Sequence, residues 1–283
     1  MTKDAQVELL IKNALNEDIG DGDHSTLSTI EAGSNGKAVL KIKQEGILAG
    51  VEVAEKIFRF MEPGIKFVVQ KKDGSVMKFG EQAFEVTAKV HSILKCERLV
   101  LNCMQRMSGI ATLTHQYTQK LASYKTRLLD TRKTTPNFRV LEKEAVRIGG
   151  AINHRFGLYD MIMLKDNHID YCGGIANAIE KAYGYVQTQK PGLKIEVETR
   201  SLDDVAIVLK TGKVDRIMLD NFTPLLISEA LKMIAGRFET EASGGINLDN
   251  LESFAATGVD YISSGAIIHQ ATSLDLSLKA VIQ

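Results

Sequence analysis

Residues 217–245 read IMLDNFTPLLISEALKMIAGRFETEASGG. A short apolar strand at 217–219 is followed by an amphipathic stretch and a second short strand at 238–242, which is the pattern of a βα unit. Further strands of this kind are predicted at 128–129, 161–164, 193–197 and 261–262. Six or seven such units are too few for a complete eightfold barrel. We therefore predict an incomplete α/β barrel, and an open doubly wound sheet is the alternative that strand count does not exclude.

The chain ahead of these units has a different, mixed pattern. Periodicity and turn residues predict helices at 7–16 and 51–61 and strands at 37–44, 65–71 and 82–90. A long apolar helix follows, and Ser108-Gly109 is expected to interrupt it before a second helix begins. We therefore expect two domains, an α+β domain at 1–110 and a catalytic barrel at 111–269.

Composition limits the kinds of partner. The 283 residues contain 35 Lys plus Arg and 35 Asp plus Glu, so no global field favours nucleic acid or an anionic membrane. The N-terminus lacks the apolar core of a signal peptide, and no run reaches the ~20 apolar residues that span a bilayer. Cys96, Cys103 and Cys172 form no CxxC pair and are interpreted as buried free thiols. We expect a cytoplasmic globular protein that binds neither nucleic acid nor membrane.

Polar residues follow every predicted strand of the barrel. Active sites of parallel α/β folds form at the carboxyl ends of the strands, so these residues are the first candidates for function. They are found at 130–136, at 165–168, at Glu196 and Glu198, at 220–221, at 243–245 and at 263–265.

Two of these acids share one strand. Glu196, Val197 and Glu198 alternate, so both glutamates point to the same side. If that side is the barrel interior, the acids need a metal or a basic partner, because burying an uncompensated carboxylate is costly. Asp220 ends another apolar strand, and the same argument applies to it. The alternative is that the glutamates face solvent at a sheet edge, and the pattern leaves open which of them faces the site.

Basic residues are also expected to converge if their loops share one face. The predicted group consists of Arg132, Lys133, His154, Arg155 and Lys165. Cations close together repel one another unless anions lie between them, so the ligand is expected to be strongly anionic. For Arg139 and Lys143, which fall on an expected helix, a solvated basic surface is an equal alternative.

The last two strand ends carry glycine. Barrels often bind a phosphate on backbone amides at this place. We interpret the two loops as one phosphate site that includes Ser243, Gly244, Gly245 and Gly265. The alternative is that these glycines only make tight turns between strand and helix.

Taken together, several stretches resemble the quinolinate phosphoribosyltransferase family. They are DTRKTTP at 130–136, NHRFGLYD at 153–160 and LKDNHI at 164–169, and the spacing between them also fits. Supporting matches are EDIG at 17–20, ER at 97–98, SGIAT at 108–112, LDNF at 219–222, SGGI at 243–246 and SGA at 264–266. The resemblance covers nearly the whole chain. His24, Asn137 and Ala151 depart from the family pattern at positions without a chemical role.

The resemblance implies an architecture and an assembly. It implies an N-terminal α/β sandwich domain, an incomplete TIM-like α/β barrel, and a C-terminal segment at 270–283 that packs back on the first domain. It also implies a homodimer whose active sites are completed across the interface. Arg98 is then the residue that each subunit contributes to the site of the other.

The resemblance further implies a pentosyltransferase reaction in NAD biosynthesis. Quinolinate and phosphoribosyl pyrophosphate would give nicotinate mononucleotide, pyrophosphate and carbon dioxide, with Mg²⁺ and without an organic cofactor. The residues expected to bind the quinolinate carboxylates are Arg98, Arg132, His154 and Arg155. The residues expected to act in catalysis are Lys133, Lys165, Glu198 and Asp220. Both lysines would serve substrate and pyrophosphate, both acids would lie near the ribose and hold Mg²⁺ directly or through water, and the glycine loops would hold the 5′-phosphate.

Two other functions fit parts of the pattern. The first is the function of a close relative with the same fold but another acceptor, such as nicotinate, or of the uncharacterised homologues found beside molybdate transport genes. The full basic set suits a dicarboxylate and therefore favours quinolinate. A non-catalytic sensor of phosphorylated metabolites would need the glycine loops but not Lys165, Glu198 and Asp220 together.

Overall fold

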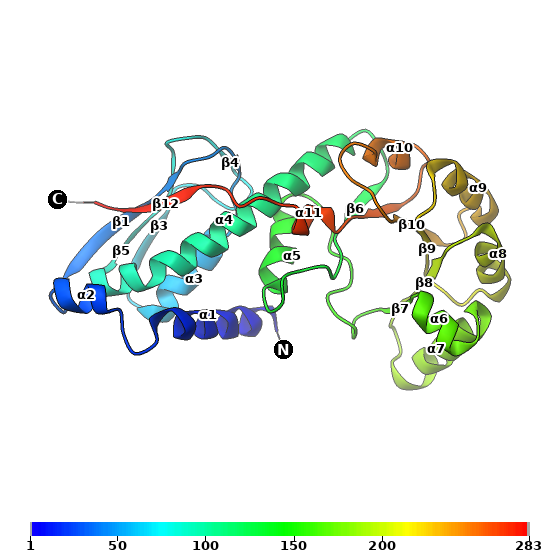
Figure 1. The fold of residues 1–283 in the computed structure, drawn as a ribbon, viewed down its shortest axis with the longest axis horizontal. Coiled ribbons are helices and arrows are strands. Elements are labelled where there is room, and N and C mark those ends of the chain that lie inside the picture. Colours follow the sequence, from blue (N-terminus) through cyan, green and yellow to red (C-terminus); the bar gives the residue numbers. More distant parts are fainter. Residues whose placement is uncertain (1, 282–283) are drawn as a thin grey trace. The chain divides into compact units, whose positions relative to one another are not determined.

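The computed structural model describes residues 2–281, and the chain divides into two compact units (Figure 1). Unit 1 contains the chain up to residue 115, residues 134–150 and the chain from residue 267. Unit 2 contains residues 116–133 and 151–266.

Unit 1 is built on an antiparallel four-stranded sheet. Its strands, in sheet order, are β12 (Leu276–Ala280), β1 (Asn35–Ile42), β5 (Gln82–Lys89) and β3 (Lys66–Val69). A separate two-stranded sheet pairs β2 (Gly46–Ile47) with β4 (Val76–Met77). The helices are α1 (Lys3–Ile19), α2 (His24–Thr29), α3 (Val51–Met61), α4 (Val90–Lys120, which continues into unit 2), α5 (Arg139–Ile148) and α11 (Ala266–His269).

The core of unit 1 forms between α3 and the sheet. Phe58 of α3 packs 6.2 Å from both Phe67 of β3 and Phe84 of β5, measured between ring centroids. Phe67 and Phe84 stack at 4.5 Å. The predicted helices and strands of this region are all present, and all of them except β3 have a buried face that the period of their apolar residues specifies. The C-terminal segment supplies β12, whose Leu278 pairs with Leu40 of β1.

The predicted interruption of α4 at Ser108-Gly109 is wrong, because the helix runs unbroken from Val90 to Lys120. Gly109 is there for packing: a Cβ at this position would lie 2.1 Å from the carbonyl oxygen of Thr272. The Ser108 hydroxyl accepts from the backbone N–H of Ala49 at 3.0 Å and donates to the carbonyl oxygen of Ala49 at 3.2 Å. The two small residues therefore allow other segments to approach the helix closely.

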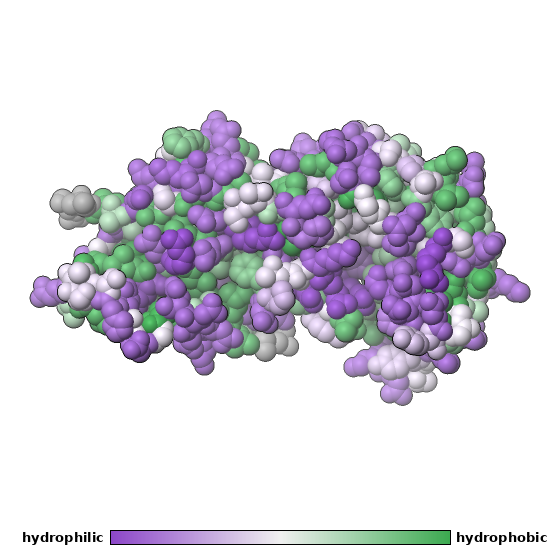
Figure 2. All heavy atoms as spheres, viewed as in Figure 1, coloured by the Kyte–Doolittle hydropathy of each residue, from purple (hydrophilic) through white to green (hydrophobic). Residues whose placement is uncertain are grey.

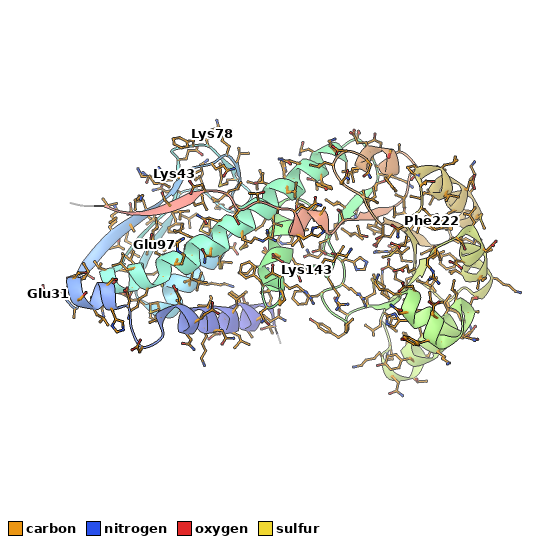
Figure 3. The ribbon with its side chains drawn as sticks, in the orientation of Figure 1. Glu31, Lys43, Lys78, Glu97, Lys143 and Phe222 are labelled. Atoms are coloured by element: carbon orange, nitrogen blue, oxygen red, sulfur yellow. The ribbon has the colours of Figure 1, made fainter. Side chains whose placement is uncertain are left out.

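The compact units also differ from the expected boundary at 110/111. Unit 1 extends to His115, and it includes 134–150, which the sequence places in the barrel. Within unit 1, α5 makes a buried ion pair: Arg106 of α4 donates to Glu142 of α5 at 3.0 Å, and Glu142 is 0% exposed. Lys143 of the same helix, labelled in Figure 3, is 2% exposed, so the solvated-surface alternative is wrong for it. Arg139 is half-buried and donates to Thr134 Oγ1 at 2.9 Å.

Unit 2 is built on six parallel strands. They are β6 (Arg127–Leu129), β7 (Ile162–Leu164), β8 (Ile195–Thr199), β9 (Arg216–Asp220), β10 (Glu239–Ser243) and β11 (Tyr261–Ser263). The helices that connect them are α6 (Asp166–Cys172), α7 (Ile175–Gln189), α8 (Leu202–Thr211), α9 (Pro224–Ile234) and α10 (Leu251–Ala255), and Figure 1 shows α7, α8 and α9 along the outside of the sheet.

The strand order decides between a barrel and an open sheet. It is β6-β11-β10-β9-β8-β7, so β7 to β11 follow one another and the first strand lies beside the last. A doubly wound sheet would reverse its order at a switch point, whereas this order requires the sheet to curl until β6 meets β11. The ring stays open between β6 and β7, apart from a single bridge between Leu129 and Ile152. The incomplete barrel is therefore confirmed.

Capping residues in the sequence mark where two helices of the barrel begin, shortly after the preceding strands end. The Ser201 hydroxyl accepts from the backbone N–H of Asp204 at the start of α8. Thr223 caps α9 in the same way, and Pro224 occupies its first turn. All five residues of β8 are buried, as expected for a strand covered on both faces.

Among residues 2–281, no helix has both the length and the apolar character that crossing a membrane requires. The face drawn in Figure 2 carries mainly hydrophilic residues with scattered hydrophobic ones between them, which is normal for a protein surface in water.

Candidate active site

Charged side chains gather at the carboxyl ends of β7, β8 and β9. Lys165 follows β7 directly, and its Nζ donates to Glu198 Oε2 of β8 at 2.8 Å. Glu198 is 6% exposed, whereas the Lys165 side chain is 45% exposed. This ion pair therefore lies at the rim of the barrel, where a ligand can reach it.

Asp220, the last residue of β9, is adjacent to this pair. Burial raises the pKa of Asp220 and the charge of Glu198 raises it further, while Lys165 and hydrogen bonds from Ser243 and Asn221 oppose the shift. Two carboxylates that repel one another favour a bound cation, which would relieve the repulsion. Carboxylate oxygens are the ligands that Mg²⁺ prefers, so this pair of residues fits a magnesium ion.

Arg155 and Arg132 bring positive charge to the same unit. Arg155 is 9% exposed, and its Nη1 donates to the carbonyl oxygen of Met161 at 3.2 Å. Burial lowers the pKa of Arg155, and the positive charge of Arg132 lowers it further. The structure thus brings these two guanidinium groups close enough to repel, and a bound anion would stabilise both. Lys133 is exposed, and its backbone N–H donates to Thr131 Oγ1.

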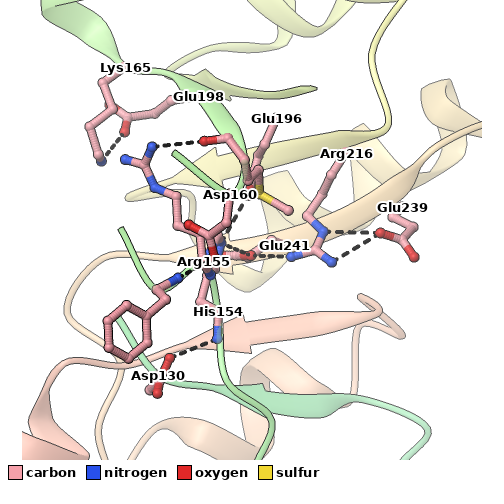
Figure 4. Close-up of polar contacts among 12 residues, drawn as sticks. Asp130, His154, Arg155, Asp160, Lys165, Glu196, Glu198, Arg216, Glu239 and Glu241 are labelled. Carbon is pink, nitrogen blue, oxygen red and sulfur yellow. Dashed lines mark hydrogen bonds and ion pairs between the residues drawn. The ribbon is translucent and has the colours of Figure 1, made fainter. Parts of the chain in front are cut away.

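A second charged layer lies deeper in the barrel (Figure 4). His154 Nε2 lies 3.0 Å from Glu196 Oε2 and 3.2 Å from Glu241 Oε2. Arg216 Nη1 donates to the same Glu241 oxygen at 3.0 Å. Glu196 and Glu241 are both 0% exposed. Both glutamates of β8 therefore face the interior, with Glu198 at the rim and Glu196 one layer below, and the alternative that they face solvent is wrong.

Burial and mutual contact shift the pKa values of His154 and Glu196 in the deeper layer. Burial disfavours a charged His154, but the adjacent carboxylates of Glu196 and Glu241 outweigh it and raise the pKa of His154 to about 9. Burial and the charge of Glu241 raise the pKa of Glu196 to about 7. The backbone N–H of Arg155 donates to His154 Nδ1 at 2.6 Å, which competes with protonation of that atom. We therefore assign the shared proton to the Nε2 side, between the imidazole and the two carboxylates.

His154, Glu196 and Glu241 also have the spacing of a metal site, since one ligand atom from each lies within 4.8 Å of the others. Arg216 argues against that interpretation, because its guanidinium already supplies a cation to Glu241. Arg216 compensates the charge of Glu241, and the proton on the Nε2 side of His154 lies between the two carboxylates, so the buried charges are reduced without a metal.

The two glycine loops lie at the ends of neighbouring strands, β10 and β11. Gly244 has φ +97°, and a Cβ there would lie 2.3 Å from Asn221 Oδ1, so this position requires glycine for packing. Gly245 has φ +62° with open space around the position of a Cβ. Ser264, which precedes Gly265, is tied to the barrel by its hydroxyl, which donates to the carbonyl oxygen of Ile246 at 2.9 Å.

A hollow of about 770 Å³ lies at the opposite, amino ends of the strands. It is lined by Lys125, Arg127, Lys194, Val214, Asp215, Gly236, Arg237, Phe238, Glu239, Asp260 and Tyr261. Its acids serve the fold: Asp215 accepts from the backbone N–H of Ile195, and Asp260 accepts from the backbone N–H and hydroxyl of Thr240. The residues suited to chemistry are at the carboxyl ends, as expected for a barrel of this kind.

Comparison with known families assigns most of the chain to two family domains. Residues 23–108 match the N-terminal domain of quinolinate phosphoribosyl transferase, and residues 110–279 match its C-terminal domain. The chain belongs to the quinolinate phosphoribosyltransferase family. The matched C-terminal domain includes the rim residues Lys165, Glu198 and Asp220 as well as the deeper layer.

Individual members of the family are similar to this chain over nearly the whole of its length. A chloroplastic nicotinate-nucleotide pyrophosphorylase [carboxylating] of Oryza sativa is 42% identical over 288 residues, covering 96% of this chain and 77% of the relative. A probable nicotinate-nucleotide pyrophosphorylase [carboxylating] of Bacillus subtilis is 41% identical, covering 96% and 93%. The crystal structure of NadC from Streptococcus pyogenes has a TM-score of 0.91 at 40% identity, covering 100% and 99%.

Arg98 is an exposed residue of α4 in unit 1. Its contribution to the site of another subunit stays a prediction. The other predicted site residues, from Arg132 to Gly265, all belong to unit 2.

Two members of the deeper layer were missed by the sequence analysis. Glu241 lies two residues after Glu239 and two before Ser243 on β10, which is the same alternation that singled out Glu196 and Glu198. Extending that argument to β10 would have found Glu241. Arg216 opens β9 at the register position opposite both Glu196 and Glu239, but pairing between strands is not visible in the sequence.

Proposed function

We propose that this chain transfers the phosphoribosyl group of phosphoribosyl pyrophosphate to quinolinate, giving nicotinate mononucleotide, pyrophosphate and carbon dioxide. The observation that carries the proposal is the charge arrangement of the barrel, where Arg132 and Arg155 provide a basic group and Glu198 and Asp220 provide carboxylates beside Lys165. A dianionic acceptor and a reaction centre that becomes positive need these opposite charges. The names of the relatives agree with this activity.

The basic residues are proposed to bind the acceptor. Arg132 and Arg155 bind the two quinolinate carboxylates, because a guanidinium group matches a carboxylate with paired hydrogen bonds and stays charged. Arg98 of a second subunit completes this binding. Lys133 and Lys165 contact both quinolinate and the pyrophosphate group. The resemblance also places His154 in this group, but its ring contacts Glu196, Glu241 and the backbone N–H of Arg155.

The carboxylates are proposed to act on the phosphoribosyl donor. Glu198 and Asp220 lie near the ribose hydroxyls and hold a magnesium ion, directly or through water. When bound, the ion neutralises charge on the pyrophosphate oxygens. The main-chain amides of Gly244, Gly245 and Gly265, with Ser243, hold the 5′-phosphate.

The residues then stabilise the charges that develop. The bond between C1 of the ribose and pyrophosphate breaks while the ring nitrogen of quinolinate forms a bond to C1. Glu198 and Asp220 stabilise positive charge on C1, and Lys165 stabilises the departing oxygen. The ring nitrogen becomes positive and stabilises the electron pair left at C2 when the 2-carboxylate departs as carbon dioxide, and this pair then binds a proton at C2. No organic cofactor is needed for these steps.

The assembly is proposed to be a homodimer, or a larger assembly of such dimers, with shared active sites. A cytoplasmic location also stays a prediction, because plant relatives are named as chloroplastic or mitochondrial proteins. Cell fractionation with an antibody against this chain tests it.

The activity is tested by incubating the purified protein with phosphoribosyl pyrophosphate and Mg²⁺, and with quinolinate or nicotinate in separate reactions. We expect mononucleotide and carbon dioxide in equal amounts from quinolinate, and no mononucleotide from nicotinate. Mononucleotide formed from nicotinate would instead show that the chain is a relative that uses nicotinate as its acceptor. Tight binding of phosphoribosyl pyrophosphate without turnover of either acceptor would favour the sensor.

A further inference from the structure

The interior of the barrel contains charge where apolar residues are usual. Branched aliphatic side chains normally fill the interior layers of parallel barrels. Here Glu196 and Glu241, both 0% exposed, enclose the imidazole of His154, and Arg216 binds Glu241. Replacing such a buried network with apolar residues is often neutral or stabilising, so stability alone does not explain it.

The segment that contains His154 is held from two sides. Asp130, which is 0% exposed and follows β6, accepts from the backbone N–H of His154 and from the side-chain amide of Asn153, each at 2.7 Å. Glu196 and Glu241 hold the other end of the residue, its ring. Three buried carboxylates, from β8, β10 and the end of β6, therefore fix one short segment of chain.

The ring of His154 is fully engaged by these contacts. Nε2 faces the two glutamates, and Nδ1 accepts from the backbone N–H of Arg155 at 2.6 Å. The side chain is only 4% exposed. Neither ring nitrogen is therefore available to bind a carboxylate of a substrate. The next residue, Arg155, extends toward the side of the cluster that is nearer Lys165 and Glu198 (Figure 4).

We propose that Asp130, Glu196 and Glu241 are positioning residues that fix His154 so that Arg155 presents its guanidinium to a carboxylate of quinolinate. The inference rests on the proposed function, since it assigns the ligand of Arg155. His154 then acts through the backbone and side chain of Arg155 and not by direct contact. Arg216 keeps Glu241 in place from the amino end of the barrel.

A matched pair of variants tests this. Glu241→Gln keeps the size of the side chain and removes the charge that holds His154. Glu239→Gln is the control, because Glu239 lies on the same strand and binds the same Arg216 at 3.0 Å but does not touch His154. Kd for quinolinate is measured by calorimetry, and KM is measured for both substrates.

For Glu241→Gln we expect Kd and KM for quinolinate to rise roughly tenfold or more, the scale of losing a hydrogen bond to a charged group. KM for phosphoribosyl pyrophosphate should change less than about twofold, because that substrate does not bind Arg155. Glu239→Gln should leave all three constants unchanged. If Glu241→Gln does not fold, Asp130→Asn and Glu196→Gln are measured in the same way.

Two results would overturn the inference. Unchanged quinolinate binding in a folded Glu241→Gln enzyme would show that the network does not position Arg155. Equal losses for both substrates would show that its role is only structural. A wild-type protein that binds no quinolinate would instead overturn the proposed function, and the assigned ligand of Arg155 with it.

Discussion

Arg155 shows how a single residue gains its role from its surroundings. It is 9% exposed, it lies near Arg132, and its backbone is tied to the ring of His154. Burying a guanidinium beside another costs free energy in the unliganded protein. A carboxylate bound there would be stabilised in return, because water competes little for a buried ion pair.

We therefore expect Arg155→Ala to lower kcat/KM for quinolinate by at least ~100-fold, about 2.7 kcal/mol of transition-state binding. Arg237→Ala is the control, since Arg237 is an exposed arginine at the other end of the same barrel and donates only to the carbonyl oxygens of Met233 and Ile234. Steady-state assays of both variants, with circular dichroism to check folding, measure the difference. A rate unchanged from wild type would remove Arg155 from the proposal.

At the same scale, the sequence predicted the rim of the site better than its interior. The proximity of Lys165, Glu198 and Asp220 was predictable because each stands at the end of an apolar strand, and strand ends converge in any parallel barrel. Glu241 and Arg216 were missed because they lie within strands, and their roles depend on which strands are neighbours. The sequence gives the charge of each side chain, whereas the order of the strands determines which side chains lie beside it.

Among the elements, α4 shows where sequence rules for helices fail. A glycine after a serine predicts an interruption, yet α4 continues through Ser108-Gly109 because tertiary contacts require small residues there. The barrel strands were predicted within one or two residues, since short apolar runs between helices have few alternatives. The placement of α5 in unit 1 was not predictable, because it depends on the buried contact between Arg106 and Glu142.

The same observation gives a prediction for stability. Gly109→Ala should lower the thermal unfolding midpoint, because the new Cβ would meet the Thr272 carbonyl at 2.1 Å and overpacking of this kind costs about 1–3 kcal/mol. Gly184→Ala is the matched control: Gly184 lies within α7, and a Cβ at this position would meet nothing within 4 Å, so alanine should stabilise the helix by up to about 1 kcal/mol. Differential scanning calorimetry measures both. Equal midpoints would show that the helix can shift away from Thr272 at little cost.

For the whole molecule, the main consequence of the proposal is that one chain is not a complete enzyme. The other predicted site residues, such as Arg132, Glu198 and Gly265, all belong to unit 2, whereas Arg98 is an exposed residue of unit 1. If each subunit lends Arg98 to the other, Arg98→Ala and Glu198→Gln damage different halves of the same site. Each homodimer should then be inactive, while a hybrid dimer should contain one site in which both halves are intact.

Mixing equal amounts of the two inactive proteins, under conditions that allow subunit exchange, should therefore restore about a quarter of the wild-type activity, because half of the dimers are hybrids with one intact site of two. A mixture of Glu198→Gln with Asp220→Asn is the control, since both changes lie in the same barrel and no hybrid site is intact. Activity assays before and after exchange, with size-exclusion chromatography to verify the dimers, measure the effect. If exchange is complete and the first mixture stays as inactive as the control, Arg98 acts within its own subunit or not at all, and the shared site must be abandoned.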